Sequence, residues 1–160
     1  MKRRFDNRIL TLPLANGIQI YQNENFLAPA ENFIMIKPQI INKKTDSEYY
    51  FEERCFITEF WNSPSDKEVS IARARVEPGV TTRLHCLKDV TERYIILEGK
   101  GRVEVGQLAP TEVCPGEVVI IPTGTPQRIT NIRDSDLIFL AVCTPRFTHS
   151  AYEYIDSDDL

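Results

Sequence analysis

Three polar residues in the second half of the chain, His85, Glu92 and Gln127, carry atoms that could bind a metal ion or move a proton. Imidazole nitrogens and carboxylate oxygens bind divalent transition metals, and they also serve as general acids and bases. Gln127 can add an amide oxygen, which is a weak ligand. The chain has 2 histidines, His85 and His149, so no three-histidine metal centre can be built from one subunit.

Glycine, proline and asparagine frame these residues at regular distances. The first segment reads Gly79-x5-His85-x-Leu87-x4-Glu92-x6-Gly99. The second segment reads Gly116-x5-Pro122-x-Gly124-x2-Gln127-x3-Asn131. They resemble the two motifs of the cupin family, G-x5-H-x-H-x3,4-E-x6-G and G-x5-P-x-G-x2-H-x3-N, at all but two anchor positions, over about residues 69–143. The resemblance implies an all-β fold: a single small jelly-roll barrel, often dimeric, with both motifs on strands that face its interior.

In metal-binding cupins the ligands are the two histidines and the glutamate of the first motif and the histidine of the second. Here His85 and Glu92 stand at two of these positions, whereas Leu87 and Gln127 occupy the others. The chain also resembles a variant of small single-domain bacterial cupins in which glutamine stands in the last place. Two alternatives stay open. Either His85, Glu92 and Gln127 weakly bind Zn²⁺, Mn²⁺, Ni²⁺ or Fe²⁺ with open positions for substrate, or they form a metal-free hydrogen-bonded cluster that lines a pocket.

Strand alternation brings further side chains toward the same interior. Residues two apart share a face of a strand, so Arg83 should lie beside His85, and Tyr94 beside Glu92. Arg83 could hold a carboxylate or phosphate of a substrate, or it could form a salt bridge with Glu92. Tyr94 could cap the pocket with its hydroxyl or belong to the core. We therefore expect His85 and Glu92 as catalytic residues, and Arg83, Tyr94 and Gln127 as substrate-binding residues.

Short β-rich runs separated by glycine, proline, asparagine and aspartate position these residues. The expected strands are Arg54–Trp61, Ser70–Val76, Thr81–Leu87, Glu92–Leu97, Gly101–Val105, Val118–Ile121, Gln127–Asn131 and Leu137–Val142. This pattern favours an all-β sandwich or barrel over residues 51–147. Residues 1–50 are expected to form an N-terminal arm with strand candidates at Gly17–Tyr21 and Phe33–Ile36. Residues 148–160 are expected to form a C-terminal tail with a helical turn over Ser150–Ile155.

The amino-acid composition limits the kinds of partner that the chain is expected to bind. The 160 residues carry 19 Lys and Arg against 23 Asp and Glu, a net charge of −4, which argues against nucleic acid as a partner. No apolar run reaches membrane-spanning length. The cysteines, Cys55, Cys86, Cys114 and Cys143, are expected to be small buried residues in a reducing cytosol. We therefore expect a cytoplasmic protein that binds a small molecule, with a homodimer implied by the family resemblance.

Three functions follow from these residues. The first is a metal-dependent enzyme acting on a small oxygen-rich or anionic molecule. The second is a metal-independent catalyst in which His85 acts as a base and Glu92 orients it. The third is a binding or sensing module without catalysis. No helix-turn-helix accompanies the barrel, which disfavours a transcription regulator.

Overall fold

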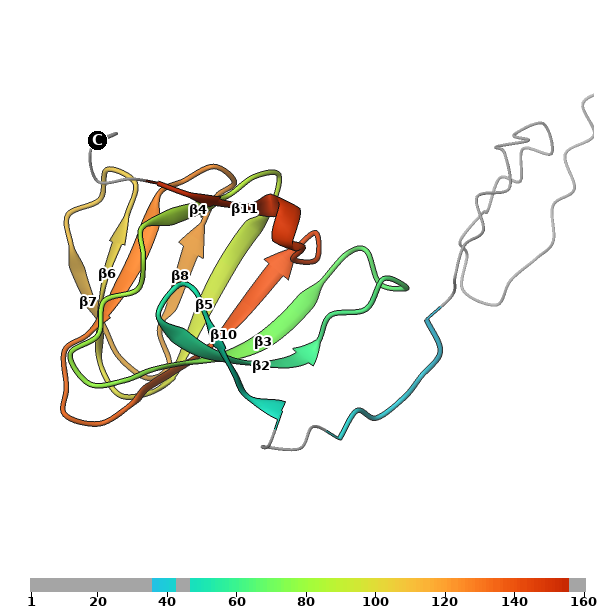
Figure 1. Cartoon of the computed structure of the whole chain (residues 1–160), viewed down its shortest axis with the longest axis horizontal. Coiled ribbons are helices and arrows are strands. Elements are labelled where there is room, and N and C mark those ends of the chain that lie inside the picture. Colours follow the sequence, from blue (N-terminus) through green and yellow to red (C-terminus); the bar gives the residue numbers. More distant parts are fainter. Residues whose placement is uncertain (1–35, 43–46, 156–160) are drawn as a thin grey trace, which may run out of the picture. The chain divides into compact units, whose positions relative to one another are not determined.

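Turn residues divide the chain into short strands, and these strands pair into two antiparallel sheets that face each other (Figure 1). The computed structural model describes residues 36–42 and 47–155. The six-stranded sheet comprises, in order, β1 (Tyr49–Phe51), β2 (Cys55–Trp61), β3 (Ser70–Val76), β10 (Leu137–Thr144), β5 (Thr91–Glu98) and β8 (Val118–Ile121). The five-stranded sheet comprises β11 (Tyr152–Tyr154), β4 (His85–Leu87), β9 (Gln127–Asn131), β6 (Gly101–Val105) and β7 (Thr111–Val113). The all-β jelly-roll fold expected from the sequence is confirmed.

Several strand predictions are confirmed residue for residue. They are Ser70–Val76, Gly101–Val105, Val118–Ile121 and Gln127–Asn131. The strand expected over Thr81–Leu87 is shorter, because only His85–Leu87 pairs as a strand and Thr81 forms an isolated bridge with Thr130. Alternation therefore does not extend continuously back from His85 to Arg83.

The C-terminal segment differs from the expected helical turn. A single 3-10 turn, η2 (His149–Ala151), is followed directly by β11, which pairs antiparallel with β4. The free edge of β4 accepts this strand, and Figure 1 shows the two strands side by side. Tertiary pairing thus overrides a weak local preference. The N-terminal candidate at Gly17–Tyr21 lies outside the described residues, as does Phe33–Ile36 except for Ile36, which is in no strand.

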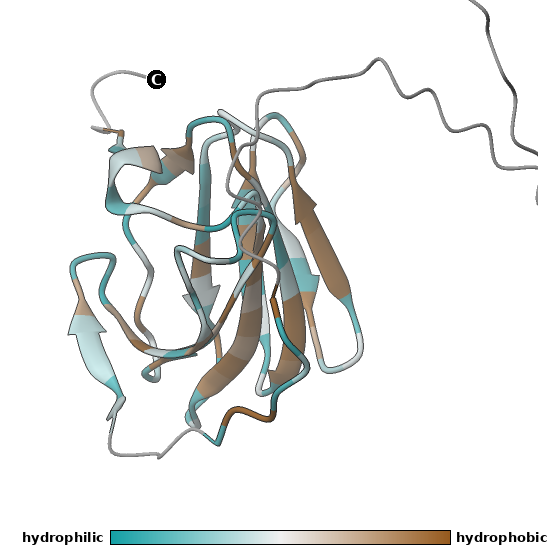
Figure 2. Ribbon diagram, turned by 90° about the vertical axis from the view of Figure 1, so that its right-hand side faces the viewer, coloured by the Kyte–Doolittle hydropathy of each residue, from teal (hydrophilic) through white to brown (hydrophobic). Residues whose placement is uncertain are grey.

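The core lies between the sheets and follows the expected alternation. Several strands are largely apolar, others combine apolar and polar residues, and the turns between them are mostly polar (Figure 2). The most deeply buried apolar side chains come from both sheets: Val76, Ile96, Ile121, Ile129 and Leu137. Gly99, which ends the first motif, turns the chain at φ +80°, where a Cβ atom would lie 2.6 Å from the Asp136 carbonyl oxygen. This turn therefore requires glycine.

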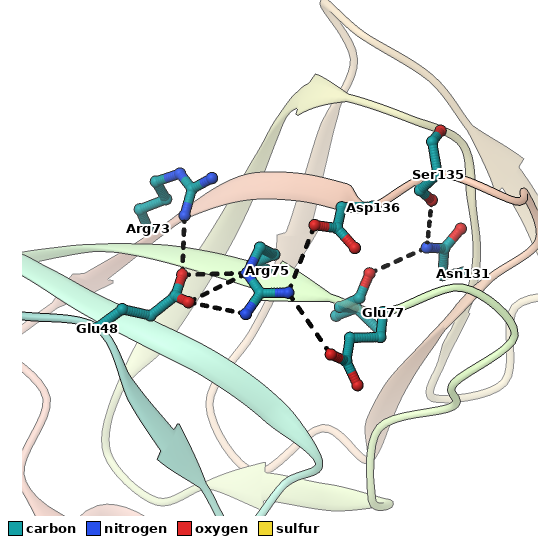
Figure 3. Close-up of polar contacts among 8 residues, drawn as sticks. Glu48, Arg73, Arg75, Glu77, Asn131, Ser135 and Asp136 are labelled. Carbon is teal, nitrogen blue, oxygen red and sulfur yellow. Dashed lines mark hydrogen bonds and ion pairs between the residues drawn. The ribbon is translucent and has the colours of Figure 1, made fainter. Parts of the chain in front are cut away.

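Polar contacts fix the ends of several strands (Figure 3). The Glu48 carboxylate, just before β1, pairs with Arg75 at 2.8 Å and with Arg73 at 3.1 Å. Asn131, the last residue of the second motif, donates from its buried amide to the carbonyl oxygens of Val76 at 2.9 Å and Ser135 at 2.8 Å. Asn131 thus joins the end of β9 to the end of β3 and to the turn before β10, which is a structural role.

All four cysteines are free thiols. Cys55, Cys86 and Cys143 are buried as expected, but the expectation is wrong for Cys114, which is exposed. Cys114 lies in the turn between β7 and β8, where its backbone N–H donates to Glu117 Oε2 at 2.7 Å. Among the described residues, no helix is long and apolar enough to cross a membrane.

Candidate functional site

A cavity of about 60 Å³ lies on the inner face of the six-stranded sheet. Small side chains make room for this cavity. Ala72 of β3 stands opposite Ala141 of β10, and Ala74 follows on the same face of β3. Strand β2 contributes the side chains of Cys55, Ile57 and Glu59, which share one face, and that of Trp61, which follows a register shift and stands opposite Ile71. One water molecule needs about 10–15 Å³ of such space, so the cavity can admit several water-sized groups or the end of a small ligand.

Glu92 on β5 presents a buried carboxyl group to this cavity, with 7% of the residue exposed. Gln127 Nε2 donates to Glu92 Oε2 at 2.6 Å, and the Cys143 thiol donates to Oε1 at 3.7 Å. Burial raises the pKa of Glu92 to about 7, and the nearby carboxyl group of Glu53 adds to the rise. Glu92 can therefore hold or release a proton near neutral pH.

Glu53 places a second carboxyl group in the cavity, against His85. Its Oε1 lies 3.2 Å from His85 Nε2, while His85 Nδ1 lies 2.9 Å from the carbonyl oxygen of Arg83. A carbonyl only accepts hydrogen bonds, so Nδ1 carries the hydrogen and Nε2 faces Glu53. Burial raises the pKa of Glu53 to about 8 and lowers the pKa of His85. Near neutral pH the shared proton therefore resides on Glu53, which donates to Nε2.

The turn between β1 and β2 delivers Glu53 to this position. The N–H of Arg54 donates to the Phe51 carbonyl at 3.0 Å, and Arg54 adopts φ +70°, which closes a three-residue turn. The Glu53 carbonyl accepts from the N–H of Arg83 at 2.9 Å, which ties the turn to the segment before β4. Neither sequence motif includes Glu53. The signal available was the polar turn Glu52-Glu53-Arg54 between two β-rich runs, which is typical of a hairpin.

Three of the predicted site residues come together. His85 stands opposite Gln127 in the β4–β9 ladder, and Gln127 contacts Glu92. His85 is 1% exposed, with its ring stacked at 5.0 Å on Tyr152 and its Nε2 covered by Glu53. His85 is not part of the cavity lining, and its Nε2 contacts Glu53, which is.

The two remaining predicted residues lie in different environments. Tyr94 is buried, lines the cavity and packs against Phe139 with ring centroids 4.4 Å apart. Arg83 is exposed, and its guanidinium lies 5.7 Å from the ring centroid of Tyr154. Arg83 is not part of the cavity lining.

The arrangement does not fit a metal ion held by the predicted trio. Gln127 turns its amide NH₂ toward Glu92, and His85 Nε2 faces the carboxyl group of Glu53. Within residues 36–42 and 47–155, no group of three or more His, Cys, Asp or Glu side chains could hold a metal ion. Gln127 Oε1 is buried and has no hydrogen-bond partner among the described residues, so this acceptor is left unused. Metal binding stays a prediction.

Comparison with known proteins identifies similar sequences and folds. A family model described as "Cupin domain" matches residues 72–143. The chain is 34% identical over 87 residues to the uncharacterized protein MJ1618 of Methanocaldococcus jannaschii, covering 54% of this chain and 69% of that protein.

Solved structures agree in fold. The structure of TT1209 from Thermus thermophilus is 23% identical, with a TM-score of 0.56, over 68% of this chain and 100% of that one. The structure of Pac13, a nucleoside dehydratase, is 12% identical, with a TM-score of 0.60, over 73% of this chain and 92% of that one. At these identities the likeness shows the fold alone.

Proposed function

This chain belongs to the cupin superfamily, and we propose that its barrel binds a small molecule in the cavity beside Glu53 and Glu92 and exchanges a proton with it. The observation that carries the proposal is the contact of 3.2 Å between Glu53 Oε1 and His85 Nε2 at the edge of that cavity. A carboxyl group that lines a cavity and is backed by an imidazole can accept a proton from a ligand and pass one on.

The proton path follows from the hydrogen bonds. A ligand C–H or O–H gives its proton to Glu53 Oε2, while the proton on Oε1 moves to His85 Nε2. The resulting imidazolium keeps its hydrogen bond from Nδ1 to the Arg83 carbonyl, which orients the ring throughout. The ligand loses one proton and His85 gains one, and the reverse transfer returns it. In this scheme Glu53 contacts the ligand, whereas His85 positions Glu53 and accepts the proton from it.

Glu92 supplies the complementary group. With a pKa raised to about 7, it is partly protonated at neutral pH and can donate to another atom of the same ligand. Gln127 holds the Glu92 carboxyl in place through Nε2. A base and an acid that reach one cavity support proton-transfer chemistry, such as an isomerisation or an elimination of water. A nucleoside dehydratase among the structural neighbours is compatible with the latter class.

Solvent exchange tests the proposal. Ligands are first found by thermal shift over sugars, phenolics and keto acids, and proton exchange into D₂O is then followed by NMR. The Glu53→Gln variant should bind the same ligands but exchange their protons more slowly, by about 10²–10⁴-fold for the loss of a general base. The Ala141→Leu variant fills the cavity and should lose binding. Binding that survives Ala141→Leu would place the ligand elsewhere and refute the proposal. Binding without exchange in the wild type would favour the non-catalytic alternative.

Further measurements on the purified wild-type protein test whether the proton exchange depends on a metal ion. Elemental analysis after purification without chelator, together with Zn²⁺, Mn²⁺, Ni²⁺ and Fe²⁺ titrations, measures whether a divalent metal binds. Proton exchange that persists after dialysis against EDTA is expected from the carboxyl pair. Exchange that disappears with EDTA and returns with one metal would support the metal-dependent enzyme instead.

The expected location and assembly are also proposals. The free buried thiols of Cys55, Cys86 and Cys143 suit a reducing compartment such as the cytoplasm. The expected homodimer could form at the edge strand β8, where Val118 and Ile120 are exposed. Light scattering of the full chain measures its mass directly.

A further inference from the structure

The side chains of the cavity lining that can carry a charge near neutral pH are all carboxyl groups. They are Glu53, Glu59 and Glu92, and the lining within the described residues includes no lysine, arginine or histidine. Arg83, the cation expected to bind an anionic substrate, lies outside this lining and faces Tyr154. An anion in the cavity would therefore meet carboxyl groups and no compensating positive charge, which is strongly unfavourable where water is scarce.

Aromatic side chains form much of the rest of the wall. These aromatic residues are Tyr49, Phe51, Trp61, Tyr94, Phe139 and Phe147. Tyr49 is 43% exposed and lies toward the solvent, whereas Tyr94 and Phe139 are buried and form the inner wall. The faces of aromatic rings attract cations, and this attraction grows when water is excluded.

One buried acceptor close to Glu92 has no hydrogen-bond donor among the described residues. Gln127 is 0% exposed, and its Oε1 has no partner among the described residues. Its Nε2 is already used by Glu92. Gln127 lies outside the cavity lining, and a ligand that reaches past Glu92 to this oxygen would have to donate to it, because an amide oxygen only accepts hydrogen bonds.

We propose that the cavity selects a small organic cation, namely a primary amine on a short apolar skeleton. This inference rests on the proposed function, because it names the ligand class of the same cavity. The positive charge of the ammonium group would favour the ionised forms of Glu53 and Glu92, which would release the protons that they carry near neutral pH and accept hydrogen bonds from the ligand. The skeleton would lie against the aromatic wall and the Ala72–Ala141 pair. The proposal replaces the anionic substrate class expected from the position of Arg83 in the sequence.

Three compounds with one carbon skeleton test it. They are 3-methylbutylamine, 3-methylbutan-1-ol and 3-methylbutanoate, titrated into the full-length protein at neutral pH and followed by NMR. The amine should bind at least about tenfold more tightly than the alcohol, a ratio equivalent to about 1.4 kcal/mol, and the carboxylate should bind most weakly. The double variant E53Q/E92Q should remove the preference for the amine over the alcohol, while Glu52→Gln on the exposed side of the turn should keep it.

The outcomes separate the two proposals. If all three compounds bind, lose binding in Ala141→Leu, and show no preference for the amine, the cavity is a ligand site but the cation inference is wrong. If the carboxylate binds as tightly as the amine, the inference is likewise overturned. If no compound binds, or if binding survives Ala141→Leu, the cavity itself is not the ligand site. The wild-type comparison decides the matter even where the double variant does not fold.

Discussion

Replacing Glu53 by glutamine should remove a pH dependence from the stability of this protein. Burial raises the pKa of Glu53 from 4.5 to about 8, so the folded protein keeps this proton at pH values where the unfolded chain has lost it. The folded state then binds more protons than the unfolded state between about pH 4.5 and pH 8, and the free energy of unfolding falls as the pH rises through this window. Above about pH 8 both states are ionised and the dependence levels off.

The size of the effect follows from the environment of Glu53. At about 1.4 kcal/mol for each pKa unit, the difference between 4.5 and about 8 sets an upper bound of about 5 kcal/mol on the cost of ionising Glu53. The side chain is 15% exposed, and His85 faces it at 3.2 Å and can become a cation, so the cost is reduced to about 2–3 kcal/mol. Glutamine has the same shape, can donate to His85 Nε2 and carries no charge at any pH.

Urea denaturation at pH values from 5 to 9 measures this prediction. Wild type and Glu53→Gln should have similar free energies of unfolding at pH 5, and the variant should be more stable by about 2–3 kcal/mol at pH 9. The difference between the two proteins isolates Glu53, because Glu92 and His85 titrate in both. Glu52→Gln changes the exposed neighbour in the same turn and should leave the slope unchanged. Equal slopes for wild type and Glu53→Gln would refute the burial of Glu53 against His85.

Other substitutions test the remaining contacts. Asn131→Ala should lower the free energy of unfolding by about 2–3 kcal/mol in urea, because two carbonyl groups lose their donor; a loss below about 0.5 kcal/mol would contradict this role. Leu87→His combined with Gln127→His should create Ni²⁺ binding detectable by calorimetry, and no binding would mean that these positions do not share one site. Glu48→Ala should cost about 0.5–1 kcal/mol at low salt, because its ion pair with Arg75 is partly exposed. That loss should shrink in concentrated salt, and an undiminished loss would argue for a packing effect instead.

The strands that sequence reasoning located to the residue share two properties. Val118–Ile121 lies between two turns that contain glycine and proline, and Gln127–Asn131 lies between a turn with glycine and proline and the polar turn Asp134-Ser135-Asp136. The apolar residues of these strands alternate or run without interruption. Local signals therefore determine both their type and their ends. The contact between His85 and Gln127 was also predictable, because both residues stand at ligand positions of the two motifs.

The elements that escaped prediction are too short to carry a pattern. Strands β1, β7 and β11 have three residues each, and such runs contain at most one full period of alternation. Their strand character comes from a partner distant in sequence, as β11 shows by pairing with β4. The sequence of the short segment itself does not indicate which distant strand it pairs with.

The same limit explains why the anionic ligand expected from the sequence differs from the cationic ligand proposed from the structure. The assignment of Arg83 to the interior assumed a continuous strand from Thr81 to Leu87, and the structure pairs this segment as a strand only from His85 onward. The assignment of His85 to the cavity surface assumed that nothing covers it, yet Glu53 arrives from a turn more than thirty residues earlier in the chain. Each difference concerns one titratable side chain, but together they change the groups that face the cavity: the expected cation lies outside its lining, and an unforeseen carboxyl group lies inside. The chemistry that this barrel can select is therefore set by the β1–β2 turn as much as by the two motifs that identify the fold.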